Sequence, residues 1–262
     1  MQTPLLQVKD LKTYFHIEEG TVLAVDGVSF DIYAGENLAL VGESGSGKSV
    51  TAMSILGLVD PPGKIIDGSI LYNDQDLTKL NDRRLENIRG KEISMIFQEP
   101  MTSLNPVYTI GRQIAESITA HESYPRDKIR QMTIEFLKLV EIPQAEQKLT
   151  QYPHEFSGGM RQRVMIAMAI ALQPKILIAD EPTTALDVTI QAQIMKLVSD
   201  LQKQMNMSVL LITHNLGIVA QTSDRVAVMY AGQIVEMART QELFSNPMHP
   251  YTRGIAEIIA HS

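Results

Sequence analysis

The sequence predicts an α/β fold that combines a mainly parallel sheet with an N-terminal antiparallel β segment and an inserted helical segment. Three observations predict it: alternating apolar and polar residues near the N-terminus, a short apolar strand that leads through a glycine-rich turn into a helix, and proline-broken helical patterns in the middle of the chain. We expect one domain over residues 1–262, with the helical segment at about 100–172 and a short proline-rich tail at about 245–262.

The N-terminal segment alternates apolar and polar positions, as over residues 6–8 and 28–32, and a turn signal lies at residues 34–35. This period of two predicts antiparallel strands. Residues 38–41 then form a short apolar run that leads into a helical stretch at 48–59. A strand, a glycine-rich turn and a helix in this order open a β-loop-α unit, so the parallel sheet is expected to begin here.

The remaining elements follow from apolar runs and helical periodicity. Strands are predicted at residues 93–97, 176–179 and 209–213, and a closing hairpin at 226–230 and 233–237. Helices are predicted at about 110–121, 126–141, 159–172 and 189–204. Residues 81–91 mix basic and acidic side chains, and we interpret them as a solvated helix face.

Composition excludes several classes of protein. The 262 residues are 44% hydrophobic and 20% charged, and no stretch approaches the roughly 20 apolar residues needed to span a membrane. Without cysteine the chain has no disulfide, thiolate zinc site or cysteine-ligated iron–sulfur cluster, so a metal is expected to be bound by oxygen. The net charge of −7 argues against nucleic acid as a partner. Because residues 1–11 show no export signal, we expect a cytoplasmic protein.

A phosphate-binding loop is predicted at residues 42–49, which fit G-x-x-x-x-G-K-[ST] between a strand and a helix. Its glycines let backbone N–H groups turn towards phosphate oxygens, and the helix presents its positive end to the same anion. Lys48 is expected to reach the β- and γ-phosphates and Ser49 to bind Mg²⁺. A merely tight turn is the alternative, and the loop alone is compatible with a kinase, a GTPase or an ATPase. The candidate nucleotide ligands are Gly42, Glu43, Ser44, Gly45, Ser46, Gly47, Lys48 and Ser49.

Two adjacent carboxylates, Asp180 and Glu181, follow the apolar run 176–179, at the end of a parallel strand where ligands collect. Adjacent side chains point in different directions, so Asp180 can hold Mg²⁺ through a water or through Ser49 while Glu181 polarises the attacking water. A solvated acidic turn is the common alternative, which the upstream phosphate loop disfavours. Since GTPases of the Ras type orient this water with a glutamine, the glutamate favours an ATPase.

A second glycine-rich helix start lies at Ser157, Gly158 and Gly159. A serine and two glycines ahead of a helix N-terminus form a potential anion site, although a serine N-cap with flexible glycines explains the same residues. Because the chain already has one complete phosphate loop, this second site implies either a second ligand or a shared one.

Over essentially its full length the chain resembles the nucleotide-binding domain of ATP-binding cassette (ABC) transporters, which has a P-loop ATPase core. The family signature L-S-G-G-Q follows the helical insertion and appears here as Phe156-Ser-Gly-Gly-Met160, with its first and last positions altered. The resemblance implies that ATP and Mg²⁺ are bound and ATP is hydrolysed. It also implies a head-to-tail dimer in which each ATP lies between the phosphate loop of one subunit and the Ser157–Gly159 turn of the other.

Other positions take their roles from the same resemblance. Gln98 matches the glutamine that contacts Mg²⁺ and water and senses the γ-phosphate. His214 matches the histidine that holds this phosphate, although a satisfied surface histidine is the ordinary alternative. Residues 184–187 match the loop that crosses the dimer interface. Phe15 lies where the family places the aromatic side chain that stacks on adenine, with Tyr14 as the close alternative.

Residues 98–106 and 246–252 resemble the branch of the family that imports peptides or nickel. This resemblance implies membrane permease subunits, an external solute-binding protein, a second ATPase that is identical or related, and a position at the cytoplasmic face of the membrane. A non-transport ABC ATPase acting on ribosomes or DNA is the alternative, but such proteins usually have two cassettes or a long coiled-coil insertion. A kinase or nucleotide switch would leave the Ser-Gly-Gly turn and His214 without a role.

Overall fold

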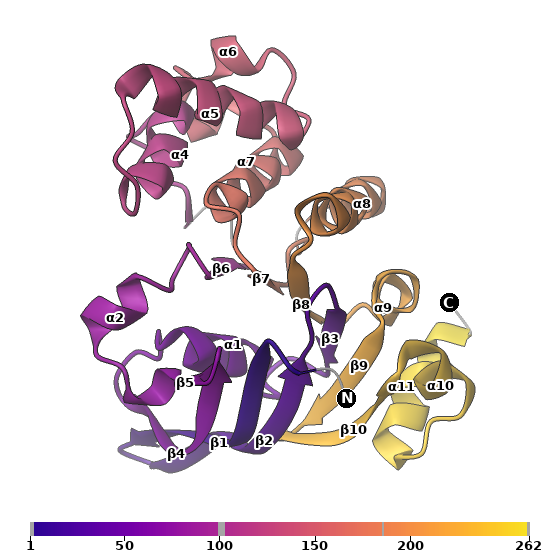
Figure 1. Cartoon of the computed structure of the whole chain (residues 1–262). Helices are drawn as coiled ribbons and strands as arrows, with labels where there is room; N and C mark the ends of the chain where they lie inside the picture. Colours follow the sequence, from indigo (N-terminus) through magenta and orange to yellow (C-terminus); the bar gives the residue numbers. More distant parts are fainter. Residues whose placement is uncertain (1–2, 99–102, 185, 261–262) are drawn as a thin grey trace. The chain divides into compact units, whose positions relative to one another are not determined.

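The computed structural model describes residues 3–98, 103–184 and 186–260, which form two compact units (Figure 1). The first unit is built from residues 1–85 and 208–262, and the second from residues 86–207. The predicted α/β class is confirmed, with an antiparallel sheet, parallel strand pairs and a group of helices inserted between two strands.

An antiparallel sheet in the order β2-β1-β4-β5 forms one part of the first unit. Residues Leu6 and Val8 of β1 are buried, as the alternation predicts, and a shift in strand register then allows Leu11 and Thr13 to be buried as well. β1 pairs with both β2 and β4. The strands are β1 (Leu6–Ile17), β2 (Gly20–Ile32), β4 (Gly63–Tyr72) and β5 (Gln75–Asp76).

A second set of strands in the first unit follows the order β10-β9-β3-β8. β3 pairs in parallel with β8 and with β9, whereas β10 is antiparallel to β9. Every residue of β3 and β8 is buried, as continuous apolar strands inside a parallel sheet should be. The bounds are β3 (Asn37–Val41), β8 (Ser208–Thr213), β9 (Arg225–Tyr230) and β10 (Gln233–Arg239).

Helices complete the first unit and attach its C-terminal tail to these strands. Val219 of α9 and Leu243 of α10 are buried against β3 and β9, and Tyr251 and Ile255 of α11 pack on the same cluster. The solvated helix expected over residues 81–91 is limited to α2. The bounds are α1 (Lys48–Leu56), η1 (Leu77–Lys79), α2 (Asp82–Glu86), α9 (Leu216–Thr222), α10 (Thr240–Ser245) and α11 (Pro250–Ala260).

The second unit contains the parallel pair β6–β7 and the helices between and after these strands (Figure 1). Ile110, Ile114 and Ile118 lie one turn apart on α4 and are fully buried, which gives this helix its apolar stripe. The four helices predicted between residues 110 and 204 are confirmed as α4, α5, α7 and α8. The bounds are β6 (Ile93–Ile96), α4 (Ile110–Thr119), α5 (Arg126–Leu139), α6 (Ala145–Lys148), η2 (Pro153–Glu155), α7 (Gly158–Ile170), β7 (Ile176–Asp180) and α8 (Val188–Met205).

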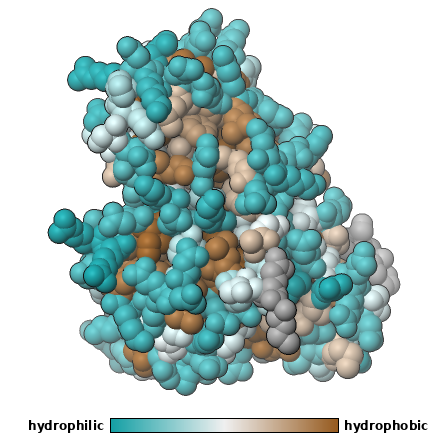
Figure 2. All heavy atoms as spheres, viewed as in Figure 1, coloured by the Kyte–Doolittle hydropathy of each residue, from teal (hydrophilic) through white to brown (hydrophobic). Residues whose placement is uncertain are grey.

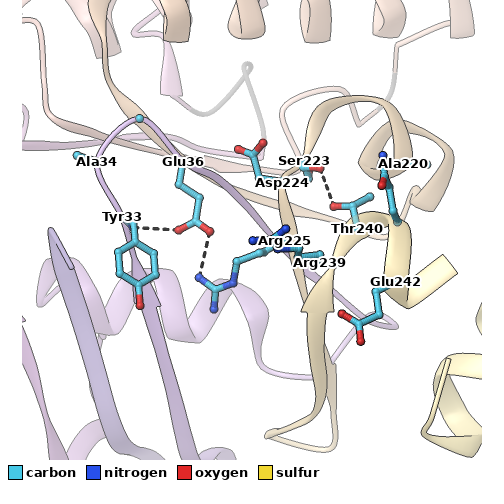
Figure 3. A pocket seen from close by; sticks show the side chains of 12 residues that line it. Tyr33, Ala34, Glu36, Ala220, Ser223, Asp224, Arg225, Arg239, Thr240 and Glu242 are labelled. Atoms are coloured by element: carbon cyan, nitrogen blue, oxygen red, sulfur yellow. Dashed lines mark hydrogen bonds and ion pairs between the residues drawn. The ribbon is translucent and has the colours of Figure 1, made fainter. Parts of the chain in front are cut away.

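A polar hollow of about 680 Å³ lies where β3 and β9 begin (Figure 3). The Glu36 carboxylate accepts hydrogen bonds from Arg225 at 3.0 Å and from the Tyr33 N–H at 2.9 Å. The Thr240 hydroxyl donates to the Ser223 carbonyl at 2.6 Å. These bonds join the β2–β3 connection to β9 and the start of α10, so the side chains of this hollow support the sheet at the end opposite to residue 42.

Within the described ranges, no helix combines the length and the apolar character that a membrane span requires. The face shown in Figure 2 is covered mostly by hydrophilic residues, with hydrophobic ones in small areas between them. Ile17, Val22 and Leu23, close to the β1–β2 turn, are each exposed.

A substitution at Gly111 tests how closely α4 packs on the segment after α6. A Cβ at this position would lie 2.7 Å from the Leu149 carbonyl oxygen, which also accepts the Gly111 N–H at 2.9 Å. Glycine-to-alanine changes inside helices ordinarily stabilise by up to about 1 kcal/mol. Here we expect Gly111→Ala to lower the melting temperature instead, because backbone atoms cannot move aside cheaply.

The matched control is Gly254→Ala in α11, where no atom lies within 4 Å of the added Cβ. This variant should melt at the same temperature as the parent or higher. Thermal unfolding followed by circular dichroism compares the two. A melting temperature for Gly111→Ala equal to or above that of the parent would contradict the packing described here.

Candidate nucleotide-binding site

The phosphate-binding loop connects β3 to α1 within the first unit. Gly45 and Gly47 have φ values of 80° and 102°, which non-glycine residues rarely adopt. A Cβ at Gly42 would lie 2.1 Å from the Met229 carbonyl oxygen, and one at Gly47 would lie 2.1 Å from that of Ala24. The loop is therefore pressed against the backbone of β9 and β2, and its glycines serve this contact as well as its turns.

Lys48 belongs to this loop, begins α1 and is buried. Its Nζ donates to the carbonyl oxygens of Gly42 and Glu43, at 2.8 Å each, and lies 3.3 Å from the Ser46 Oγ. The ammonium group is thus held at the centre of the loop. Charge-assisted hydrogen bonds from such a cation suit phosphate oxygens. Ser49 is the next residue, in the first turn of α1.

His214 lies at the same edge of the first unit's parallel strands as the loop. Val41 and Thr213 are paired in parallel register, so Gly42 and His214 each follow one member of this pair. The imidazole is exposed, and the neighbouring Asn215 caps α9 by accepting the Ile218 N–H at 3.2 Å. The location fits the predicted contact with a phosphate, and the role itself remains a prediction.

The two aromatic candidates on β1 differ in their contacts. The Tyr14 hydroxyl donates to Asp26 at 2.8 Å, and this bond is the main reason why the pKa of Tyr14 lies above its ordinary value. Phe15 is half-buried, and its ring lies against Gly63, where an added Cβ would be 2.5 Å from the Phe15 Cε1. Stacking uses the ring face and not the hydroxyl, so these contacts leave Phe15 as the predicted adenine partner and Tyr14 as the alternative.

The acidic pair ends β7 in the second unit. Asp180 is buried, and Glu181 follows it with a φ of 45°, which is uncommon for a residue with a side chain. The Glu181 Oε2 accepts hydrogen bonds from the Gln98 Nε2 at 3.1 Å and from the Thr184 hydroxyl at 2.8 Å. The structure therefore brings Gln98 and Glu181 together, and a strained backbone holds the carboxylate between two donors.

The glycine-rich turn before α7 has a clear packing role. Ser157 is the N-cap, and its Oγ accepts the Met160 N–H at 3.3 Å. A Cβ at Gly159 would lie 2.9 Å from the Ile190 Cγ2, so α7 starts close to α8. This geometry matches the N-cap alternative. It does not exclude an anion, because a serine oxygen that accepts one bond can still donate its proton.

The sequence analysis did not predict the hydrogen bond between Thr184 and Glu181. The only sequence signal for this bond is a hydroxyl residue three positions after the carboxylate, in the segment that resembles the interface loop. Gln191 fixes this segment by donating to the carbonyls of Thr183 and Leu186, at 3.2 and 3.1 Å. Residue 185 of this segment and residues 99–102 of the stretch 98–106 lie outside the described residues.

A family model described as ABC transporter matches residues 25–184. The chain belongs to the ABC transporter family, and the prediction of an ABC ATPase is confirmed. Its fold is similar to that of the ATP-binding cassette MJ0796, whose dimeric post-hydrolysis state was solved with bound ADP and Pi. The TM-score is 0.80 at 27% identity, over 90% of this chain and 98% of that one. cbiO1 from Clostridium perfringens, part of the transporter complex cbiONQ, gives 0.79 at 28% identity, over 94% and 92% of the two chains.

The curated relatives narrow the comparison to one branch. The oligopeptide transport ATP-binding protein AppD of Bacillus subtilis is 57% identical over 252 residues, which is 96% of this chain and 77% of AppD. The dipeptide transport ATP-binding protein DppD of the same organism is 54% identical, over 96% of this chain and 75% of DppD. The resemblance to the peptide branch is thereby confirmed.

Glu181→Gln tests whether this carboxylate is the catalytic base. The amide can still accept a hydrogen bond from Gln98 or Thr184 but cannot take a proton, so we expect turnover to fall by about 100-fold or more with nucleotide binding retained. Steady-state ATPase assays and binding of a fluorescent ATP analogue measure the two effects. Asp200→Asn, an exposed carboxylate on α8, is the control and should change neither. Normal hydrolysis by Glu181→Gln would move the base elsewhere, with His214 as the next candidate.

Proposed function

We propose that this chain binds ATP with Mg²⁺ and hydrolyses it as one of a pair of ABC subunits that power peptide import through separate membrane permeases. The observation that carries the chemistry is the Glu181 carboxylate held between Gln98 and Thr184 at the end of β7. The family membership and the peptide transport relatives support the remainder.

In this proposal the loop at 42–49 holds the phosphates. Backbone amides at the start of α1 face the anion, and Lys48 exchanges its carbonyl partners for the β- and γ-phosphates. Glu181 accepts a proton from the water whose oxygen attacks the γ-phosphorus, and the bond to the ADP oxygen breaks. Gln98 keeps the Glu181 carboxylate in place and orients this water. His214 holds the γ-phosphate, and Phe15 stacks on the adenine.

The residues proposed for Mg²⁺ fit that ion chemically. Ser49 offers a hydroxyl oxygen, Gln98 an amide oxygen and Asp180 a carboxylate, and Mg²⁺ prefers oxygen donors. Mg²⁺ usually keeps several waters and takes only one or two carboxylates together with substrate phosphates, which agrees with a single aspartate. When bound, the ion would neutralise charge that develops on the phosphate oxygens.

Peptide is proposed as the solute because the relatives AppD and DppD are named for oligopeptide and dipeptide transport. Nickel is a solute of a related branch only. The permeases, the external binding protein and the position at the cytoplasmic face of the membrane belong to the same proposal. The alternative of an ABC ATPase acting on ribosomes or DNA is disfavoured, since the similar structure cbiO1 is part of a transporter complex and the net charge is −7.

Uptake by cells tests the proposed solute. Cells whose only copy of this chain carries Glu181→Gln should lose uptake of a radiolabelled tripeptide, because ATP hydrolysis no longer resets the transporter. Uptake of a free amino acid contained in that tripeptide is the control and should stay normal. Unchanged tripeptide uptake combined with lost nickel uptake would overturn the assignment to peptide.

The shared ATP site is tested by mixing two inactive variants. Ser157→Arg should prevent dimerisation while leaving ATP binding by the monomer, and Lys48→Ala should abolish ATP binding. A mixed dimer regains one intact site, formed by the loop of the first variant and the turn of the second, so part of the ATPase activity should return.

Gln147→Arg, an exposed change on α6, controls for the added charge and should behave as the parent. Rescue that appears only when a related second ATPase is added would indicate a heterodimer. Full activity of the Ser157→Arg monomer at every protein concentration would contradict the shared site.

A further inference from the structure

The C-terminal tail makes a direct hydrogen bond to the phosphate-binding loop. The Glu43 N–H donates to the Tyr251 hydroxyl at 3.1 Å, across 208 positions of sequence. The Tyr251 ring also packs on Tyr230 at the end of β9, with ring centroids 4.6 Å apart. Tyr251 stands in the first turn of α11, in the stretch 246–252 to which sequence reasoning gave no chemical role.

Glu236 on β10 fixes the turn that carries Tyr251. Its carboxylate accepts the N–H groups of Met248 at 2.8 Å and His249 at 2.9 Å, and the His249 Nδ1 accepts the Tyr251 N–H at 3.2 Å. Burial opposes ionisation of Glu236, but the neighbouring Thr252 hydroxyl and these two amides outweigh it and hold the pKa of the carboxyl below its ordinary value. The Glu236 carboxylate therefore holds this turn as a charged group with strong hydrogen bonds.

The loop thus has separate supports for its two parts. The Gly232 N–H, in the β9–β10 turn, donates to the Ser46 carbonyl at 3.0 Å. Glu43, earlier in the loop, is exposed, and its N–H has the tail as its partner. The Glu43 carbonyl accepts the Lys48 Nζ at 2.8 Å and the Ser46 N–H at 3.2 Å, so the bond to Tyr251 adds a support on the N–H side of this residue.

We propose that Tyr251 is a positioning residue that holds the first part of the phosphate-binding loop in its nucleotide-binding shape, with Glu236 setting Tyr251 in place. This inference rests on the proposed function of the loop as the ATP site. Tyr251 bonds to Glu43 and takes no part in the reaction. A loop ordered before binding loses less entropy when nucleotide binds, so the hydroxyl lowers the Kd for ATP without changing the chemical step.

Tyr251→Phe removes only the hydroxyl and keeps the ring against Tyr230. We expect the Kd for a fluorescent ATP analogue and the KM for ATP to rise about 3- to 10-fold, the effect of one lost hydrogen bond. The kcat should stay within about twofold of the parent, because the phosphates order the loop once ATP is bound. Tyr230→Phe is the matched control, since this exposed neighbour also loses only a hydroxyl, and its constants should not change.

Amide hydrogen exchange gives a readout that a general loss of stability would not produce. Without nucleotide, peptides that contain residue 43 should exchange faster in Tyr251→Phe than in the parent, and ATP should remove this difference. Peptides from the helices of the second unit should exchange alike in both. Glu236→Ala should also raise the Kd for the ATP analogue. The double variant Glu236→Ala/Tyr251→Phe should bind no more weakly than the weaker-binding of the two single variants, because both changes remove the same support of the loop.

Lys48→Ala separates failure of this inference from failure of the proposed function. If Lys48→Ala loses ATP binding while Tyr251→Phe keeps the parental Kd, KM and exchange, the role of Tyr251 is overturned and the ATP site stands. If Lys48→Ala binds ATP normally, the loop is not the ATP site and both proposals fall. A lower kcat with unchanged KM in Tyr251→Phe would also overturn the positioning role.

Discussion

The close approach of backbone to backbone at Gly42 and Gly47 is the constraint on which the nucleotide site depends. At both positions an added Cβ would lie 2.1 Å from a carbonyl oxygen, of Met229 on β9 and of Ala24 on β2. The loop owes its shape to the two sheets of the first unit as much as to its own sequence. Because Lys48 bonds to carbonyls inside this loop, the sheets also determine where the cation is held.

The fold class could be predicted because its signals are local. The continuous apolar runs of β3 and β8 and the isoleucines one turn apart on α4 need no knowledge of distant residues. β4 was not among the predicted strands. Its sequence contains Gly63 and Gly68, and the adjacent Ile65 and Ile66 break the alternation, so its conformation is decided by pairing with β1.

The residues of the candidate site also differ in whether local sequence could predict their roles. The loop at 42–49 and the pair Asp180–Glu181 are contiguous motifs whose chemistry can be derived from residue type and strand position. Gln98 and His214 could be named only through a family resemblance, since one glutamine or one histidine after a strand carries little information. The bond from Glu43 to Tyr251 spans 208 positions and has no local signal, so tertiary structure alone reveals it.

The turn before α7 has a structural role that is compatible with the function proposed for it. Gly159 is required where α7 meets Ile190, since its added Cβ would lie 2.9 Å from that side chain. Ser157 caps the helix through an oxygen lone pair, so its hydroxyl proton can still be donated. A substitution at Gly159 therefore disturbs helix packing before it affects any ligand. A substitution at Ser157, which is exposed, reports more directly on what binds in front of the turn.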